Sequence, residues 1–150
     1  MEIKKADINN AEEILELQKL SYLSEAEIYN DYLIPPLHQT IEEIKKEFQY
    51  KTFIKVISNG KIIGSIRGYE DNNTCYIDKI IVHPVYQNQG IGTRLLNHLE
   101  QLFEGVKRYE LFTGYKSEKN LHIYKKNGYK RFKEEKLNKN VKLIYLEKIQ

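Results

Sequence analysis

The sequence predicts an α/β (α+β) fold in which a mixed sheet carries helices on both of its faces. Three segments typical of strands lie together in the middle of the chain. After them the patterns run helix, strand, helix, strand and strand, and this order is typical of a mixed sheet covered by helices. A length of 150 residues fits a single domain over residues 1–150 that can bury a proper core.

The N-terminal third is predicted to form one short strand and two helices. Residues 2–6 are strand-like, and Asn9 or Asn10 can cap an amphipathic helix that continues to about Asn30. The next signal is Pro35-Pro36, which favours an extended break. The second helix begins after Thr40, which forms a capping box with Glu43.

The rest of the chain holds the remaining strands and two further helices. Asn59-Gly60 is a strong signal for a tight hairpin turn between the first two central strands. The predicted strands are Thr52–Ser58, Lys61–Glu70, Thr74–Val82, Arg108–Thr113, Tyr129–Leu137 and Val141–Lys148, and the predicted helices end near Phe103 and span Ser117–Asn127.

The composition argues against several classes of protein. The net charge is +3 with lysines and glutamates mixed along the chain, so we expect no nucleic-acid partner. No apolar run of about 18 residues and no signal peptide are present, so we expect a cytoplasmic protein without a membrane partner. The single Cys75 fits a reducing compartment, and the four histidines lack the spacing of a metal site.

One segment carries most of the functional information. Residues 82–96 read as the end of a strand, a polar turn with Gly90 and Gly92, and the start of an amphipathic helix. The first four N–H groups of a helix have no partner within it, and the helix dipole adds partial positive charge there. The segment therefore predicts a site for a phosphate or pyrophosphate group.

Spacing separates three kinds of phosphate-binding loop. The Walker sequence is absent, and a dinucleotide fingerprint would need a third glycine where Leu95 stands. The pattern Gln/Arg-x-x-Gly-x-Gly/Ala fits residues Gln87 to Gly92. In this loop the sequence resembles the GNAT acetyltransferase superfamily, whose members bind acetyl-CoA through it.

A second block supports the same resemblance. Residues 120–129 look like the family helix that carries an Asn and a Tyr and ends at a Gly. Asn120 and Tyr124 are four residues apart and so face one side of that helix, while Gly128 stands at its C-terminal cap. The two blocks occur in the order found in the family, and the resemblance covers about residues 1–148.

The resemblance implies a fold and a reaction. The fold is a mostly antiparallel, seven-stranded central sheet whose fourth and fifth strands splay apart, and the pantetheine arm of the cofactor fills the gap. The reaction is that of an N-acetyltransferase, in which acetyl-CoA is the co-substrate and a primary amine attacks it directly in a ternary complex. The acceptor is then a small-molecule or peptide amine, and no metal takes part.

The resemblance also implies roles for individual residues. The backbone of Ile80 and Val82 would pair with pantetheine, and the Val82 N–H would polarise the thioester carbonyl. Asn120 would hydrogen-bond the pantetheine arm, and Tyr124 would donate a proton to the departing sulfur. The backbone amides that would bind the pyrophosphate are those of Gln87, Asn88, Gln89, Gly90, Ile91, Gly92 and Thr93.

The sequence does not decide which group acts as the general base. An amine with a pKa of about 10.4 is almost entirely protonated at pH 7, so it must lose a proton before it attacks. Asp78 shares strand parity with Tyr76, Ile80 and Val82, which would direct it to the acceptor side. Glu70 is the second candidate; either acts directly or through a water, or both are ordinary surface carboxylates.

The remaining site residues concern the acceptor and the charge of the cofactor. Tyr22, Glu25, Tyr29 and Tyr32, with Glu27 and Asp31 nearby, either form a face for a cationic amine or pack on the sheet with the acids in solvent. Lys125, Lys126, Lys130, Arg131 and Lys133 either attract the cofactor's 3′-phosphate or form a solvated surface.

Two other mechanisms compete with this reaction, and the oligomeric state is a separate question. Cys75 is expected to be an inert buried thiol rather than the nucleophile of a ping-pong mechanism, because no helix N-terminus lies beside it. A CoA-binding sensor without turnover is the main rival, and Asn120 and Tyr124 argue against it, because a pure binder needs no proton donor. A homodimer through the last two strands is left open.

Overall fold

The polypeptide folds around one seven-stranded sheet with helices on both faces, and this confirms the predicted fold class. The computed structural model describes residues 1–150. The strand order is β1-β2-β3-β4-β5-β7-β6. The strands are β1 (Glu2–Lys5), β2 (Thr52–Ser58), β3 (Lys61–Asp71), β4 (Thr74–Val82), β5 (Arg108–Gly114), β6 (Lys130–Lys136) and β7 (Lys142–Ile149). The helices are α1 (Ala11–Tyr29), α2 (Pro35–His38), α3 (Ile41–Glu47), α4 (Ile91–Leu102) and α5 (Glu118–Lys126).

Local sequence signals explain several of these boundaries. Asn59 and Gly60 both have positive φ, 52° and 76°, as a two-residue hairpin between β2 and β3 requires. Thr40 and Glu43 form the predicted capping box, in which each side chain accepts a hydrogen bond from the other's backbone N–H. These turns depend on adjacent residues only, which is why the sequence predicts them.

Two local expectations are wrong. Pro35-Pro36 do not form an extended break but begin α2, because proline at the first helical positions lacks only an N–H that would have no partner there. The side chain that caps the entry to α1 is that of Asp7, which accepts from the Asn9 N–H at 2.9 Å, whereas Asn10 makes no side-chain cap bond to α1. Asp7 caps a short 3-10 turn that precedes the helix.

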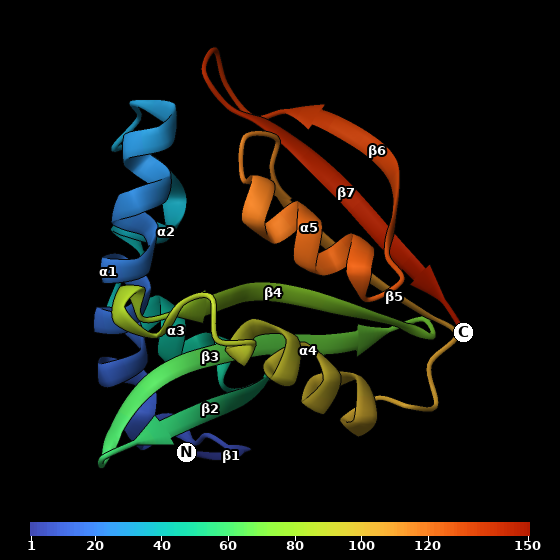
Figure 1. The fold of residues 1–150 in the computed structure, drawn as a ribbon. Helices are drawn as coiled ribbons and strands as arrows, with labels where there is room; N and C mark the ends of the chain where they lie inside the picture. Colours follow the sequence, from blue (N-terminus) through green and yellow to red (C-terminus); the bar gives the residue numbers. More distant parts are fainter.

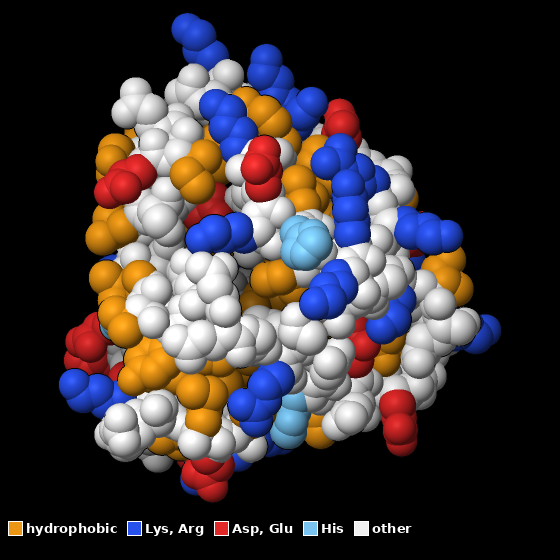
Figure 2. Space-filling model, viewed as in Figure 1, with side chains coloured by type: hydrophobic (Ala, Val, Ile, Leu, Met, Phe, Trp, Pro, Cys, Tyr) orange, Lys and Arg blue, Asp and Glu red, His pale blue; other side chains and the backbone are white.

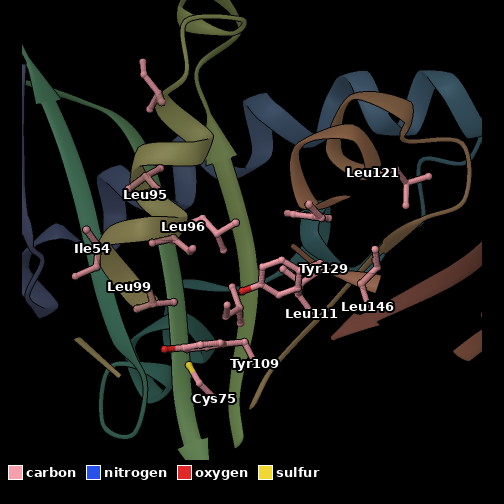
Figure 3. Close-up of a cluster of buried hydrophobic side chains, with 14 of the residues drawn as sticks. Ile54, Cys75, Leu95, Leu96, Leu99, Tyr109, Leu111, Leu121, Tyr129 and Leu146 are labelled. Carbon is pink, nitrogen blue, oxygen red and sulfur yellow. The ribbon is translucent and has the colours of Figure 1, made fainter. Parts of the chain in front are cut away.

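Apolar side chains on the two faces of the sheet hold the helices in place. On one face, Leu95, Leu96 and Leu99 of α4 point toward the sheet, with Cys75 and Tyr109 close by (Figure 3). On the other face, a second cluster joins α1 and α3 to β2 and β4. Leu99 is fully buried, so its truncation to alanine would cost about 2–5 kcal/mol of stability. None of the helices combines the length and the apolar character needed to cross a bilayer.

The sheet divides between β4 and β5, as expected from the family resemblance. This pair is the one parallel pair of the sheet, and its ladder runs only from Thr74↔Arg108 to Tyr76↔Glu110. Beyond Tyr76 the two strands separate. Figure 1 shows the result: α4 covers the β2–β4 half, α5 covers the β5–β7 half, and α1 runs past the open end. The gap between the two halves of the sheet therefore arises from the diverging backbones of β4 and β5.

A bulge in β4 makes the side chains of this strand face differently from the prediction. Between Asp78 and Ile81, β4 has one residue more than the paired stretch of β3, and Lys79 adopts a left-handed φ of 49°. The extra residue reverses the alternation of side chains. Ile80 and Val82 therefore pack with the α4 face, whereas Asp78 points to the α1 and α3 face. The expectation that Asp78 shares a face with Ile80 and Val82 is wrong for this reason.

Candidate active site

Two cavities meet where β4 and β5 separate. The loop cavity, of about 710 Å³, lies between the turn before α4, the beginning of α5 and α1. The apolar cavity, of about 520 Å³, lies between α1, α2, β5 and the β6–β7 turn. Figure 2 shows this face hollowed near its centre, with Lys and Arg side chains around the hollow. The residues that line both cavities are Tyr22, Glu25, Ile80, Ser117 and Asn120.

The turn before α4 presents unpaired backbone amides to the loop cavity. No protein group accepts a hydrogen bond from any amide between Gln87 and Thr93. Gly90 has a φ of 79°, and a Cβ placed there would meet nothing within 4 Å. Helix dipole and free amides together favour an anion at this end of α4. All the predicted cofactor-binding residues except Gln89 line this cavity. They are Ile80, Val82, Gln87, Asn88, Gly90, Ile91, Gly92, Thr93 and Asn120.

The edge of β4 faces the gap with a free N–H group at Val82. The His83 N–H donates to the Ile63 carbonyl of β3 at 2.8 Å. Because successive residues of a strand direct their N–H groups to opposite sides, the Val82 N–H points away from β3 and into the gap. The Val82 carbonyl accepts from the Ser21 hydroxyl at 3.1 Å, so α1 closes over this edge.

Three lysines outnumber the two glutamates, Glu25 and Glu118, that line the loop cavity, and leave it with an excess of positive charge. Lys116, Lys119 and Lys126 line it. Of the basic cluster predicted near α5, only Lys126 is among them; Lys125, Lys130, Arg131 and Lys133 line neither cavity. Lys116 and Lys119 were missed because only the packing of α5 beside the turn brings them to the site. Their three-residue spacing across the start of α5 is the signal that would have found them.

Tyr124 and Asn120 lie on the predicted side of α5. Tyr124 is 5% exposed and lines the apolar cavity, and Asn120 lines both cavities. Burial raises the pKa of the Tyr124 hydroxyl, and the negative charges of Glu25 and Asp78 raise it further. The phenol therefore keeps its proton at neutral pH and is suited to donate it.

Glu25 occupies the junction of the two cavities. The Ser117 hydroxyl donates to its carboxylate, with Oγ 2.7 Å and 2.9 Å from the two oxygens. Burial raises the pKa of Glu25, and the hydrogen bond from Ser117 offsets part of that rise. Tyr22 and Tyr29 line the apolar cavity beside Glu25, whereas Tyr32, Glu27 and Asp31 line neither cavity. Sequence reasoning placed Glu25 on this helix face without singling it out.

Asp78 lines the apolar cavity but is already paired. Its carboxylate lies 3.0 Å from the ammonium groups of both Lys51 and Lys79. Burial would raise the pKa of Asp78, but Lys79, Lys51 and the buried Arg67 outweigh that effect and lower it. A carboxylate held in this way is a weak proton acceptor.

The other proposed groups lie outside the site. Glu70 is exposed near the end of β3, opposite Cys75, and lines neither cavity. Burial raises the pKa of the Cys75 thiol to about 12, so the thiol stays protonated. No group of three or more His, Cys, Asp or Glu side chains is arranged to hold a metal ion.

Comparison with known proteins adds to this geometry. The model of the acetyltransferase (GNAT) family matches residues 11–129. A curated protein of Bacillus subtilis (strain 168), UPF0157 protein YqkA, is 28% identical over 121 residues, which are 81% of this chain. Those residues span 35% of the length of that protein.

Solved structures share the fold over nearly the whole chain. The PaiA N-acetyltransferase of Thermoplasma acidophilum, in complex with coenzyme A, superposes with a TM-score of 0.73 at 22% identity, covering 99% of this chain and 98% of that one. The ribosomal-protein-S18-alanine N-acetyltransferase of Escherichia coli gives 0.81 at 15% identity, covering 99% and 92%. At such identities the likeness shows the fold.

Proposed function

Because the chain belongs to the GNAT acetyltransferase family, we propose that it moves the acetyl group of acetyl-CoA to a primary amine by direct attack in a ternary complex. One observation carries the proposal. The free amides from Gln87 to Thr93 face a cavity that opens into a second cavity beside Tyr124. One cavity is suited to an anionic cofactor and the other to an acceptor.

The loop cavity fits coenzyme A in charge and in donor geometry. The free amides at the start of α4 are donors for a pyrophosphate, and Lys116, Lys119 and Lys126 supply positive charge around it. The N–H of Val82 and the side chain of Asn120 are donors along the gap toward the apolar cavity. When bound there, acetyl-CoA supplies a thioester as the acetyl donor.

Two groups of the chain are proposed to act at the reacting end. The Val82 N–H polarises the carbonyl under attack, as an oxyanion-hole donor does. Tyr124, which keeps its proton at neutral pH, gives that proton to the departing sulfur. Cys75 is fully buried with a pKa raised to about 12, which supports direct attack by the amine over an acyl-enzyme.

We propose that the protein acts in the cytoplasm, without a nucleic-acid or membrane partner. The single free thiol of Cys75 fits a reducing compartment. The test of the proposed reaction is release of free thiol from acetyl-CoA when an amine is added, with acetyl-CoA binding measured separately by calorimetry. Tight binding without release from any amine would favour a sensor of acetyl-CoA, and no binding would overturn the assignment of the loop cavity.

A further inference from the structure

The carboxylates around the apolar cavity differ in whether a cation pairs with them. Asp78 forms ion pairs with Lys51 and Lys79. Glu43 is exposed, and its side chain accepts from the Thr40 N–H at 2.9 Å. Neither Glu43 nor Glu25 has a cationic partner, but Glu25 is half-buried and its hydrogen bonds come from Ser117 alone. Glu25 is therefore the half-buried negative charge of the cavity that no cation pairs.

That charge lies at the end of the cavity where the two substrates would meet. Glu25 and Ser117 line both cavities, and Tyr124 lines the apolar cavity close enough to Glu25 for its pKa to respond to that charge. An ammonium group on Glu25 would thus be next to the gap that the Val82 N–H faces. The position suits the attacking nitrogen.

The far end of the cavity is apolar. Its walls come from the segment after α1, from β5, from the turn between β6 and β7 and from the start of β7. The apolar side chains there are Ile34, Phe112, Leu137, Val141 and Leu143. None of them can pair a charge or a peptide group, and burying such a group without a partner is costly. A volume of about 520 Å³ is in the range of sites for small molecules.

We propose that this cavity takes a small acceptor with one primary ammonium group, bound by Glu25, on an uncharged alkyl or aryl body that lies against the apolar wall. The inference rests on the proposed function and names its substrate class. A polyamine or an aminoglycoside that lies along this apolar wall would place its further ammonium groups against side chains that cannot pair them. A peptide would do the same with its backbone amides.

Glu25 then also receives the proton that the ammonium must lose. The ammonium gives one proton to the carboxylate, and the free amine attacks the acetyl carbonyl. The C–N bond forms as the C–S bond breaks. The second proton lost by the nitrogen replaces the one that Tyr124 gives to sulfur. The balance is one amide, one free thiol and one proton released from Glu25 to solvent.

The first test compares acceptors of graded shape. Ethylamine, butylamine, hexylamine and 2-phenylethylamine are titrated into the CoA-saturated protein by calorimetry and assayed for thiol release, with spermidine and kanamycin as polycations. Affinity and kcat/KM are expected to rise about threefold to fourfold per added CH2 until the cavity is full. Hexylamine is expected to exceed both polycations by at least about tenfold.

The second test measures separately how the Glu25 charge and the apolar wall contribute to amine binding. Glu25→Gln keeps the shape and the contact with Ser117 but removes the charge, so amine affinity should fall by about tenfold or more while acetyl-CoA affinity stays unchanged. Leu137→Ser should weaken hexylamine more than ethylamine. Leu33→Ser is the matched control, because Leu33 is 81% exposed and lines neither cavity.

The outcomes distinguish this inference from the proposed reaction. Hexylamine binding that is lost in Glu25→Gln supports the inference even if no thiol is released, in which case the reaction fails and the cavity assignment stands. Thiol release with spermidine or kanamycin but not with hexylamine supports the reaction and overturns the inference. An unchanged amine affinity in Glu25→Gln, with the fold intact, also overturns it.

Discussion

The Ser117 hydroxyl donates to the carboxylate of Glu25, and its oxygen lies 2.7 Å and 2.9 Å from the two carboxylate oxygens. The contact joins α1 to the loop before α5 across 92 positions of sequence. Both residues line both cavities. The hydrogen bond therefore stands at the point where the acetyl donor and the amine are proposed to meet, and it lowers the pKa of a carboxyl whose burial raises it.

Removing this hydrogen bond should move the pH dependence of the reaction. In Ser117→Ala the pKa of Glu25 should rise further above the ordinary carboxyl value, because the hydrogen bond lowers it and burial raises it. Since the ionised carboxylate is the active form, the acid limb of the kcat/KM profile should shift to higher pH. The titratable groups that interact with the charge of Glu25 are the hydroxyls of Tyr22, Tyr29 and Tyr124.

The measurement is a pH–rate profile of wild type, Ser117→Ala and Ser58→Ala. Ser58 ends β2 and lines neither cavity, so its variant should follow the wild type. An acid limb that stays in place or moves to lower pH in Ser117→Ala would remove Glu25 from the proton path.

Tyr124→Phe should lower kcat by about 10²- to 10⁴-fold, the usual range for loss of a general acid, with little change in acetyl-CoA affinity. The ring and its packing remain, so the fold should be kept. Calorimetry and thiol release on the same preparations separate the two effects. Tyr50→Phe is the matched control, because Tyr50 is 61% exposed and lines neither cavity. Equal rates in the two variants would refute the role of Tyr124.

Gly90→Ala should weaken acetyl-CoA binding by about tenfold or more. Gly90 has a φ of 79°, and an added methyl group would stand where the free amides approach the pyrophosphate. Gly60 has a φ of 76° in the β2–β3 turn and equally open space around it.

Gly60→Ala therefore carries the same backbone strain, about 1–2 kcal/mol, without touching the loop cavity. Both variants should lose similar stability by urea titration, and only Gly90→Ala should lose affinity for acetyl-CoA. A matching loss of affinity in Gly60→Ala would mean that strain, and not the amide loop, governs binding.

Beneath the site, a buried ion pair should make stability depend on pH. Arg67 is fully buried, and its guanidinium lies 2.9 Å from the Glu47 carboxylate. Burial would raise the pKa of Glu47, but Arg67 and Lys51 outweigh it and lower that pKa. Because the folded-state pKa lies below the unfolded value, this stabilisation is present above about pH 4.5 and is lost as pH falls through the folded value.

Glu47→Gln should therefore cost about 3–5 kcal/mol at pH 7, since it leaves the Arg67 charge without its anion. Its free energy of unfolding should also vary less than that of the wild type between about pH 5 and pH 3. Urea titrations across that range measure both. Parallel curves for the two proteins would contradict the linkage.

The parts of the site that depend on adjacent residues were open to prediction. The loop from Gln87 to Gly92 and the pair Asn120 and Tyr124 are set by a tight turn and by helical spacing, and all of these residues except Gln89 line a cavity. The turn at Asn59-Gly60 follows the same rule. Each of these features needs only a few consecutive residues to form.

The parts that depend on tertiary contacts were not predictable. Lys79 is not a glycine, so nothing in the sequence marks the left-handed bulge that turns Asp78 away from the face of Ile80. The acids of α1 have similar spacing, and only the contact with Ser117 selects Glu25. Tyr29 reaches the Lys116 N–H at 2.7 Å because Gly114 lacks a side chain that would collide with its hydroxyl.

The most direct test of the central claim is thiol release from acetyl-CoA with hexylamine as acceptor, run beside calorimetric titration of acetyl-CoA. We predict that acetyl-CoA binds, that thiol release requires the amine and saturates with it, and that Tyr124→Phe slows release without loosening the cofactor. Tight acetyl-CoA binding without release from hexylamine or any other primary amine would contradict the transferase, and absence of binding would contradict the assignment of the loop cavity.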